Sequence, residues 1–207
     1  MVKSPKSSQK SKQQADVKEA AAAANAVELL KDEHEEVAEL FHAFESAAAA
    51  EQQALAEQVC QKLTVHARIE EEILYPAAKD VLEEGDVDLV NEAAVEHATV
   101  KDLIVKIEAM DATDEPYKAT VTVLSEYVKH HVEEEETELF PLLQDSDLDL
   151  DAMGAKLASR KQELTAELGT ESNDGDTIDD GEEDEEVATV VAARSVSKSK
   201  NTSRKLV

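Results

Sequence analysis

His66-Ala67-Arg68-Ile69-Glu70, followed by Leu74-Tyr75-Pro76, returns later in the chain as His131-Val132-Glu133-Glu134-Glu135, followed by Leu139-Phe140-Pro141. In both copies the proline comes ten residues after the histidine. On a helix, a His and a Glu four residues apart are separated by about 40° around the axis and roughly 6 Å along it. The imidazole and the carboxylate can therefore face the same partner. The repeat predicts a metal site that is built twice.

The repeated unit is longer than this pair, because a lone histidine precedes each copy. His34 lies 32 residues before His66, and His97 lies 34 residues before His131. A unit of about 65 residues with two helices cannot bury its own apolar face, whereas two such units together form a four-helix bundle. The predicted class is therefore all-α, with an up-down-up-down four-helix bundle.

Apolar residues at alternating steps of four and three predict the helices. They run over 19–50, 52–75, 87–110 and 116–140, and a shorter fifth helix over 150–168 is expected to cover one end of the bundle. In the second helix this stripe is Val59, Leu63, His66, Glu70 and Ile73. We predict three regions: a disordered basic arm at 1–18, the bundle with its fifth helix at 19–168, and a disordered acidic then basic tail at 169–207.

The charge balance limits the possible partners. The chain has 21 basic and 48 acidic residues, and its formal net charge is −27. Such a charge repels phosphate backbones and anionic membranes, so we expect no nucleic-acid partner and no membrane partner, and cations as natural ligands. Cys60 is the only cysteine, and no stretch approaches the ~20 apolar residues of a membrane span. We expect a cytoplasmic protein.

Burial of the repeated carboxylates favours metal binding. An ionised Glu without a partner in an apolar core costs at least several kcal/mol. Binding a cation, pairing with a base or turning out to solvent would each avoid this cost, and Lys101 is the one base placed near the site. Imidazoles and carboxylates without thiolates suit iron, manganese or zinc. The candidate ligands are His34, His66, Glu70, His97, His131 and Glu135.

Other side chains near these positions are open to two interpretations. Glu71 or Glu96 could supply an extra ligand, although most of the neighbouring glutamates are expected to face solvent. His42 and His130 lie off the stripes and are predicted at the surface or behind the ligands. Tyr75 and Phe140 precede the prolines, where we expect a structural role at a helix end.

From Val27 to Leu143 the chain resembles the hemerythrin-like, or HHE cation-binding, family. The resemblance rests on the order His34, His66 with Glu70, His97, His131 with Glu135, and on the Leu-Tyr-Pro and Leu-Phe-Pro endings. It implies a non-haem centre of two iron ions with oxo and carboxylate bridges, in which Glu70 and Glu135 bridge and the four histidines complete the shells. Manganese or zinc is the less favoured metal.

One departure from the family bears on the expected function. Where oxygen-carrying hemerythrins have a second histidine one turn after the third-helix histidine, this chain has Lys101. One imidazole fewer implies an open position on an iron, suited to O2, NO or peroxide, or to iron handling. We therefore expect a metal-binding protein rather than a dedicated enzyme. The alternative is a metal-poor helical interaction or scaffold module. The sequence predicts no particular oligomeric state.

Overall fold

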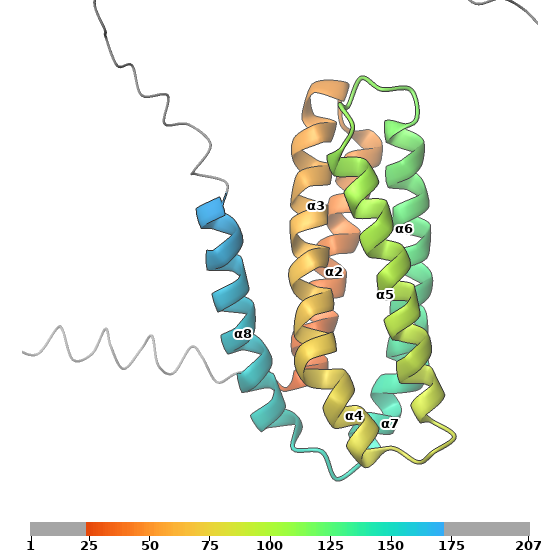
Figure 1. Cartoon of the computed structure of the whole chain (residues 1–207), viewed down its shortest axis with the longest axis vertical. Helices are drawn as coiled ribbons and strands as arrows, with labels where there is room; N and C mark the ends of the chain where they lie inside the picture. The colour runs from red at the N-terminus through yellow and green to blue at the C-terminus, as the bar shows by residue number, and fades with distance from the viewer. Residues whose placement is uncertain (1–23, 172–207) are drawn as a thin grey trace, which may run out of the picture. The chain divides into compact units, whose positions relative to one another are not determined.

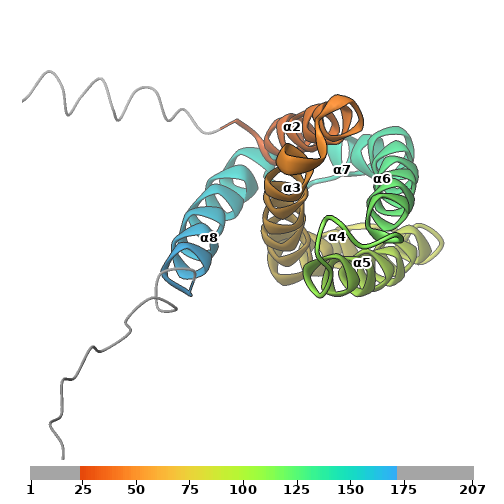
Figure 2. The same ribbon diagram turned by 90° about the horizontal axis from the view of Figure 1, so that it is seen from above.

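The computed structural model describes residues 24–171, and the regular structure in this part of the chain is helical (Figure 1). Four long helices form the bundle: α2 (Ala26–Ser46), α3 (Ala49–Ile69), α5 (Val87–Glu108) and α6 (Tyr117–Glu134). Figure 2 looks along these helices and shows α3 beside α2 and α5, with α6 closing the square against α2 and α5. The all-α four-helix bundle predicted from the repeat is confirmed.

Each half of the bundle contains one π-helical turn at the same repeat position. α3 continues into η1 (Glu70–Leu74) and then α4 (Tyr75–Val81), and α6 continues into η2 (Glu135–Leu139) and then α7 (Phe140–Asp145). In η1 and η2 the N–H of the residue after the turn donates to the carbonyl of the glutamate that opens it. A π-turn inside an α-helix is rare and is frequent at functional sites.

The π-turns correct two predictions. The second and fourth helices do not end before their prolines, because Pro76 and Pro141 lie in the first turn of α4 and α7, where a missing N–H costs least. The extra residue in the turn also moves the buried face on by one position. After Glu70 the buried residues are Leu74, Tyr75 and Ala78, whereas Ile73, predicted on the stripe, is only half-buried.

α2 begins and ends inside the predicted range 19–50. Its first residue, Ala26, follows a capping box in which the side chain of Asn25 accepts from the N–H of Glu28 and the carboxylate of Glu28 accepts from the N–H of Asn25. These reciprocal bonds satisfy donors that a helix start otherwise leaves free. α2 ends at Ser46, and the side-chain amide of Gln52 donates to the carbonyl of Phe44 across the turn to α3.

The fifth helix, α8 (Leu150–Glu171), lies along the outer side of α2, α3 and η1 rather than over an end of the bundle as predicted. Met153, Leu157 and Leu164 are its buried residues. Gly154 allows the contact, because a Cβ there would overlap the backbone of Ala24 to Ala26. The predicted arm at 1–18 and residues 172–207 of the tail predicted at 169–207 lie outside the described residues, whereas residues 169–171 belong to α8.

Two apolar clusters fill the bundle, and the candidate ligands lie between them. One cluster includes Leu30, Ile69 and Phe140, and the other includes Phe41, Leu63 and Leu124. The polar layer is thus enclosed along the bundle axis by hydrocarbon, which raises the cost of any unpaired charge. Among the described residues, no helix combines the length and the apolar character needed to cross a membrane.

Candidate metal centre

The structure brings all six predicted ligands together in the core. The Nε2 atoms of His34 and His66 are 3.2 Å apart, and those of His97 and His131 are 3.0 Å apart. None of the six residues exposes more than 7% of its surface, and Glu70 exposes none. Each half of the repeat therefore contributes one pair of imidazoles to a single buried cluster.

The two core glutamates connect the halves. Glu70 Oε2 lies 3.2 Å from Nε2 of His66 in its own half and 3.3 Å from Nε2 of His97 in the other. Glu135 Oε2 lies 3.5 Å from Nε2 of His131 and 3.6 Å from Nε2 of His34. Each carboxylate thus faces one histidine of each half.

The ligand atoms form two groups, each with all atoms within 4.8 Å of one another. The first contains His34, His66, Glu70 and Glu135, and the second contains Glu70, His97 and His131. Glu70 belongs to both groups. Each group thus has a set of donor atoms that could hold a metal ion.

On the side away from the cluster, every imidazole meets a glutamate through its Nδ1 atom. The pairs are His66 with Glu33 at 2.7 Å, His34 with Glu136 at 2.9 Å, His131 with Glu96 at 2.9 Å and His97 with Glu71 at 3.1 Å. We call these four the outer glutamates. A carboxylate in this place fixes both the ring orientation and the tautomer of a metal-binding histidine.

Sequence reasoning missed the role of the outer glutamates. Glu71 and Glu96 were considered as extra ligands, but their carboxylates lie behind the rings. Glu136 was expected to face solvent, and Glu33 was not singled out. Their only sequence signal is position: Glu33 and Glu96 precede the lone histidines by one residue, and Glu71 and Glu136 follow the core glutamates by one.

These contacts determine what the cluster requires. When Nδ1–H donates to an outer glutamate, Nε2 of the neutral ring carries a lone pair and no proton. In each half, two such lone pairs then face each other across about 3 Å. This arrangement is repulsive unless a cation or a proton lies between the rings. Both oxygens of Glu70 and Oε2 of Glu135 are likewise buried without a hydrogen-bond donor.

The core carboxyls titrate apart, as expected for two like charges in one cavity. Burial raises the pKa of Glu135 well above its usual value, and the negative charge of Glu70 adds to this effect. Burial also acts on Glu70, but the charges of His66 and His97 outweigh it and lower its pKa to about 2. Burial lowers the pKa of His131 to about 4.

Tyr75 is a polar contact that the sequence did not predict. Its hydroxyl donates to Oε1 of Glu135 at 2.9 Å and lies 3.3 Å from Nε2 of His97. Phe140, at the equivalent position of the second half, stacks on the ring of His34 with a centroid distance of 5.9 Å, as Tyr75 does on His97 at 5.4 Å, but it has no hydroxyl. Tyr75 thus does not stand at a helix end as expected, because its helix continues into α4, and its hydroxyl contacts the candidate ligands.

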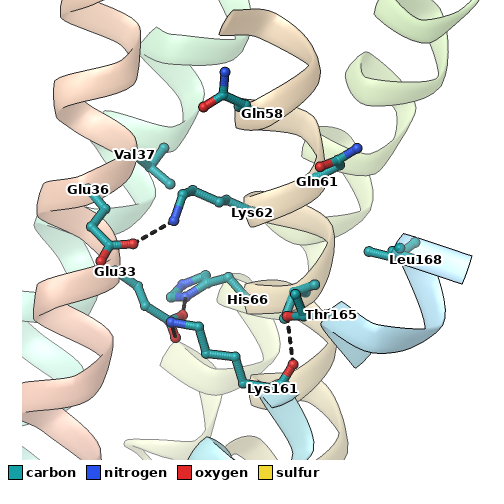
Figure 3. A pocket seen from close by; sticks show the side chains of 12 residues that line it. Glu33, Glu36, Val37, Gln58, Gln61, Lys62, His66, Lys161, Thr165 and Leu168 are labelled. Atoms are coloured by element: carbon teal, nitrogen blue, oxygen red, sulfur yellow. Dashed lines mark hydrogen bonds and ion pairs between the residues drawn. The ribbon is translucent and has the colours of Figure 1, made fainter. Parts of the chain in front are cut away.

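Two lysines form ion pairs with outer glutamates. Lys101 Nζ lies 2.6 Å and 2.5 Å from the two oxygens of Glu71. Lys161, from α8, lies 2.8 Å from Oε1 of Glu33. Figure 3 shows Lys161 reaching Glu33 beside His66, at a crevice of about 430 Å3 between α8, α2 and α3. In the described part of the chain, no lysine or arginine forms an ion pair with Glu70 or Glu135.

A cavity of about 20 Å3 adjoins the cluster inside the bundle. The four histidines line it together with apolar side chains that include Val37, Leu63, Val100 and Val128. A volume of this size holds about one water molecule. The space beside the ligands is therefore mainly apolar and suited to a molecule of a few atoms.

The two remaining histidines lie outside the cluster, as predicted. His42 is exposed on α2, and the side chain of His130 on α6 is 61% exposed. His130 Nε2 lies 3.3 Å from Glu134 Oε1 and 3.7 Å from Glu96 Oε1. His130 thus lies behind the outer glutamate of His131.

The fold and the donor set define a four-helix-bundle protein whose core carries a His and Glu cluster for metal ions. A sequence model of the hemerythrin HHE cation binding domain matches residues 25–143. The chain therefore belongs to the hemerythrin HHE cation-binding domain family, whose domain binds metal cations.

Two known proteins illustrate the similarity. A DNA nickase of Nostoc sp. strain PCC 7120 is 34% identical over 89 residues, which is 43% of this chain and 24% of the nickase. The chain thus matches about a quarter of that relative's length. A crystal structure of a hemerythrin HHE cation binding domain-containing protein from Mycobacterium kansasii matches with a TM-score of 0.63 and 24% identity, over 73% of this chain and 94% of that one. This second likeness supports the fold.

Proposed function

We propose that the core cluster binds two iron ions and that the loaded protein binds O2, NO or peroxide. The observation that carries the proposal is the pairing of imidazoles at 3.2 Å and 3.0 Å with their Nε2 atoms facing each other. Ligand atoms about 2.1 Å from one metal at right angles lie about 3 Å from each other. In both halves the spacing of the two Nε2 atoms therefore fits two adjacent ligand positions around one metal ion.

The glutamates support two ions and favour iron. Glu70 and Glu135 each face a histidine of both halves, and both oxygens of Glu70 and Oε2 of Glu135 lack hydrogen-bond donors. A mixed nitrogen and oxygen set without thiolate suits iron, with manganese or zinc as the alternatives. Iron in this place would supply Lewis-acid and redox chemistry.

The chain's own residues would hold and limit the site. The outer glutamates keep each Nε2 directed inwards, and the Tyr75 hydroxyl fixes the orientation of Glu135. The cavity of about 20 Å3 beside the histidines admits only a very small molecule. O2, NO and peroxide are of this size, which supports them as ligands.

The alternative, a metal-poor interaction module, explains less. It leaves both oxygens of Glu70 in the core without a hydrogen-bond donor, and burial of such a carboxylate costs several kcal/mol. We also propose no nucleic-acid partner, because the net charge of −27 opposes phosphate binding. DNA nicking belongs to a relative of which this chain matches only 24%, and it is not carried over to this chain.

Metal content after anaerobic Fe(II) loading tests the proposal. The parent should retain two irons per chain after desalting, and the double variant E70Q/E135Q should retain none while staying folded by circular dichroism. E57Q/E126Q is the matched control, since it makes the same changes at exposed positions of α3 and α6. A folded parent without iron, or a core variant that keeps both irons, would contradict the proposal.

NO binding to the reduced, iron-loaded protein tests the small-ligand part. Val100→Ile adds a methylene to the wall of the cavity, so it should weaken NO binding without lowering the iron content. Val59→Ile is the control, because Val59 is equally buried but does not line the cavity. Equal NO affinity in both variants would contradict the binding of NO in this cavity.

A further inference from the structure

The two halves of the bundle differ on one outer face. In the first half, Leu29, Val65, Ile69 and Ile73 belong to or pack on the apolar cluster that includes the buried residues of α8. The residues at the equivalent positions of the second half are Glu92, His130, Glu134 and Glu138. α8 thus covers one face, and the face related to it by the repeat carries carboxylates around an imidazole.

The difference extends to single atoms of two equivalent outer glutamates. Oε2 of Glu33 accepts a hydrogen bond from Nδ1 of His66, and Oε1 of Glu33 pairs with the ammonium group of Lys161. Oε2 of Glu96 likewise accepts from Nδ1 of His131. Its Oε1, however, faces Nε2 of His130 at 3.7 Å. Where the first half has its own cation, the second half has an imidazole and the further carboxylate of Glu134.

We propose that Glu96, His130 and Glu134 form an outer site for a divalent cation, through which metal reaches the core. These three residues can place one nitrogen and two oxygens within 4.8 Å of one another. This is a ligand set for Fe2+, Mn2+ or Zn2+. The ion would take the place that the Lys161 ammonium group holds at Glu33.

A buried carboxylate connects this outer site with the core. Glu135, whose Oε2 is buried without a hydrogen-bond donor, lines a narrow pocket together with Glu92, Glu96 and Glu134. Glu135 is only 2% exposed, yet it follows Glu134 directly in the chain. The pocket that Glu96 and Glu134 line therefore borders a core residue, Glu135, whose Oε2 lies 3.5 Å from Nε2 of His131. The histidine partner of Glu96 is another core ligand.

Charge and exposure agree with an entry site. The side chains of His130, Glu134 and Glu96 are 61%, 32% and 16% exposed, so accessibility decreases from the surface inwards. Within residues 24–171, none of these three side chains pairs with a lysine or an arginine. Carboxylates gathered at the mouth of a pocket raise the local concentration of cations and their rate of association.

The rate of metal loading tests the proposal, whose delivery step rests on metal binding in the core. Metal-free protein is mixed with Co2+, and uptake is followed by absorption in a stopped-flow instrument. H130A/E134Q should load about tenfold or more slowly, because focusing by the outer charges is lost. The final metal content should equal that of the parent. Glu96 is left unchanged because it orients His131.

H42A/E39Q is the matched control, with the same two kinds of substitution at exposed positions of α2. It should load at the parental rate. Equal rates for the parent and H130A/E134Q would overturn the proposal, and so would equal slowing by the control. If the parent took up no metal at all, the core itself would have failed, and that result is distinct from unchanged loading kinetics.

Binding to the outer site can also be measured by itself. In E70Q/E135Q, electron paramagnetic resonance titration with Mn2+ should detect one weak site. Adding H130A and E134Q to this variant should abolish that site, whereas adding H42A and E39Q should not. Mn2+ binding that survives the first pair of substitutions would overturn the assignment.

Discussion

Tyr75 and Phe140 occupy equivalent positions of the two halves, 65 residues apart, but only Tyr75 places a hydroxyl in the metal centre. The hydroxyl donates to Glu135, which comes from the other half, and burial raises the pKa of Tyr75 well above its usual value. Tyr75 therefore remains a proton donor over the physiological pH range. The centre is asymmetric at this point although its ligands repeat.

Tyr75→Phe should destabilise the metal-free protein by about 1–3 kcal/mol, because Oε1 of Glu135 then loses its donor in the core. Urea unfolding in the presence of a chelator measures the change. Tyr117→Phe is the control, since its buried ring packs against Phe44 away from the ligands. A loss of stability no larger than in the control would show that the hydrogen bond contributes nothing.

Glu33→Gln should weaken metal binding by about 10- to 100-fold, as is typical when the carboxylate behind a histidine ligand is neutralised. The amide can still accept from Nδ1 of His66, but it lacks the charge that raises the basicity of the ring. Competition with a coloured chelator measures the affinity. Glu36→Gln serves as the control, since Glu36 pairs with Lys62 at the surface and should leave the affinity unchanged.

Gly154→Ala should destabilise the packing of α8 by about 1–3 kcal/mol, the usual cost of overpacking. The added Cβ would lie closer than van der Waals contact to the backbone of Ala24, Asn25 and Ala26, which cannot move as a side chain can. Gly169→Ala is the matched control on the same helix, with open space around the new atom. Denaturant unfolding of the two variants should separate steric strain from helix propensity.

Cys60 should resist alkylation at pH 8 until the protein unfolds, because burial raises the pKa of its thiol to about 12. Between its unfolded pKa of 9.0 and this value, the folded state keeps a proton that the unfolded chain loses. Stability therefore falls as the pH rises, by at most about 1.4 kcal/mol per pH unit. Relative to the parent, Cys60→Ala should lose less stability above pH 9, and parallel curves would contradict this reasoning.

The bundle and the six candidate ligands could be predicted because both depend on local spacing. Helical periodicity places His66 and Glu70 on one stripe, and the repeat supplies the second pair. The π-turns were not predictable in this way. No residue preference marks Glu70 as the start of a wider turn, and the turn depends on packing that places Glu70, Leu74 and Tyr75 all in the core.

The outer glutamates and the position of α8 depend on contacts distant in sequence. Glu136 lies next to a core ligand in a run of acidic residues, and only its pairing with His34, 102 residues earlier, separates it from solvated neighbours. The role of Gly154 likewise depends on a contact distant in sequence. By composition it weakens a helix, but in the structure it allows α8 to approach the start of α2.

The carboxylates are exchanged between the halves. Glu71 of the first half fixes His97 of the second, Glu136 of the second fixes His34 of the first, and Glu135 faces His34 as Glu70 faces His97. A polypeptide of one repeat would contain every kind of residue that the centre uses, yet it could not assemble the centre alone. Two such polypeptides could do so as a symmetric dimer. The covalent joining of the halves lets each copy diverge, so that one face receives α8 while the other keeps its charges.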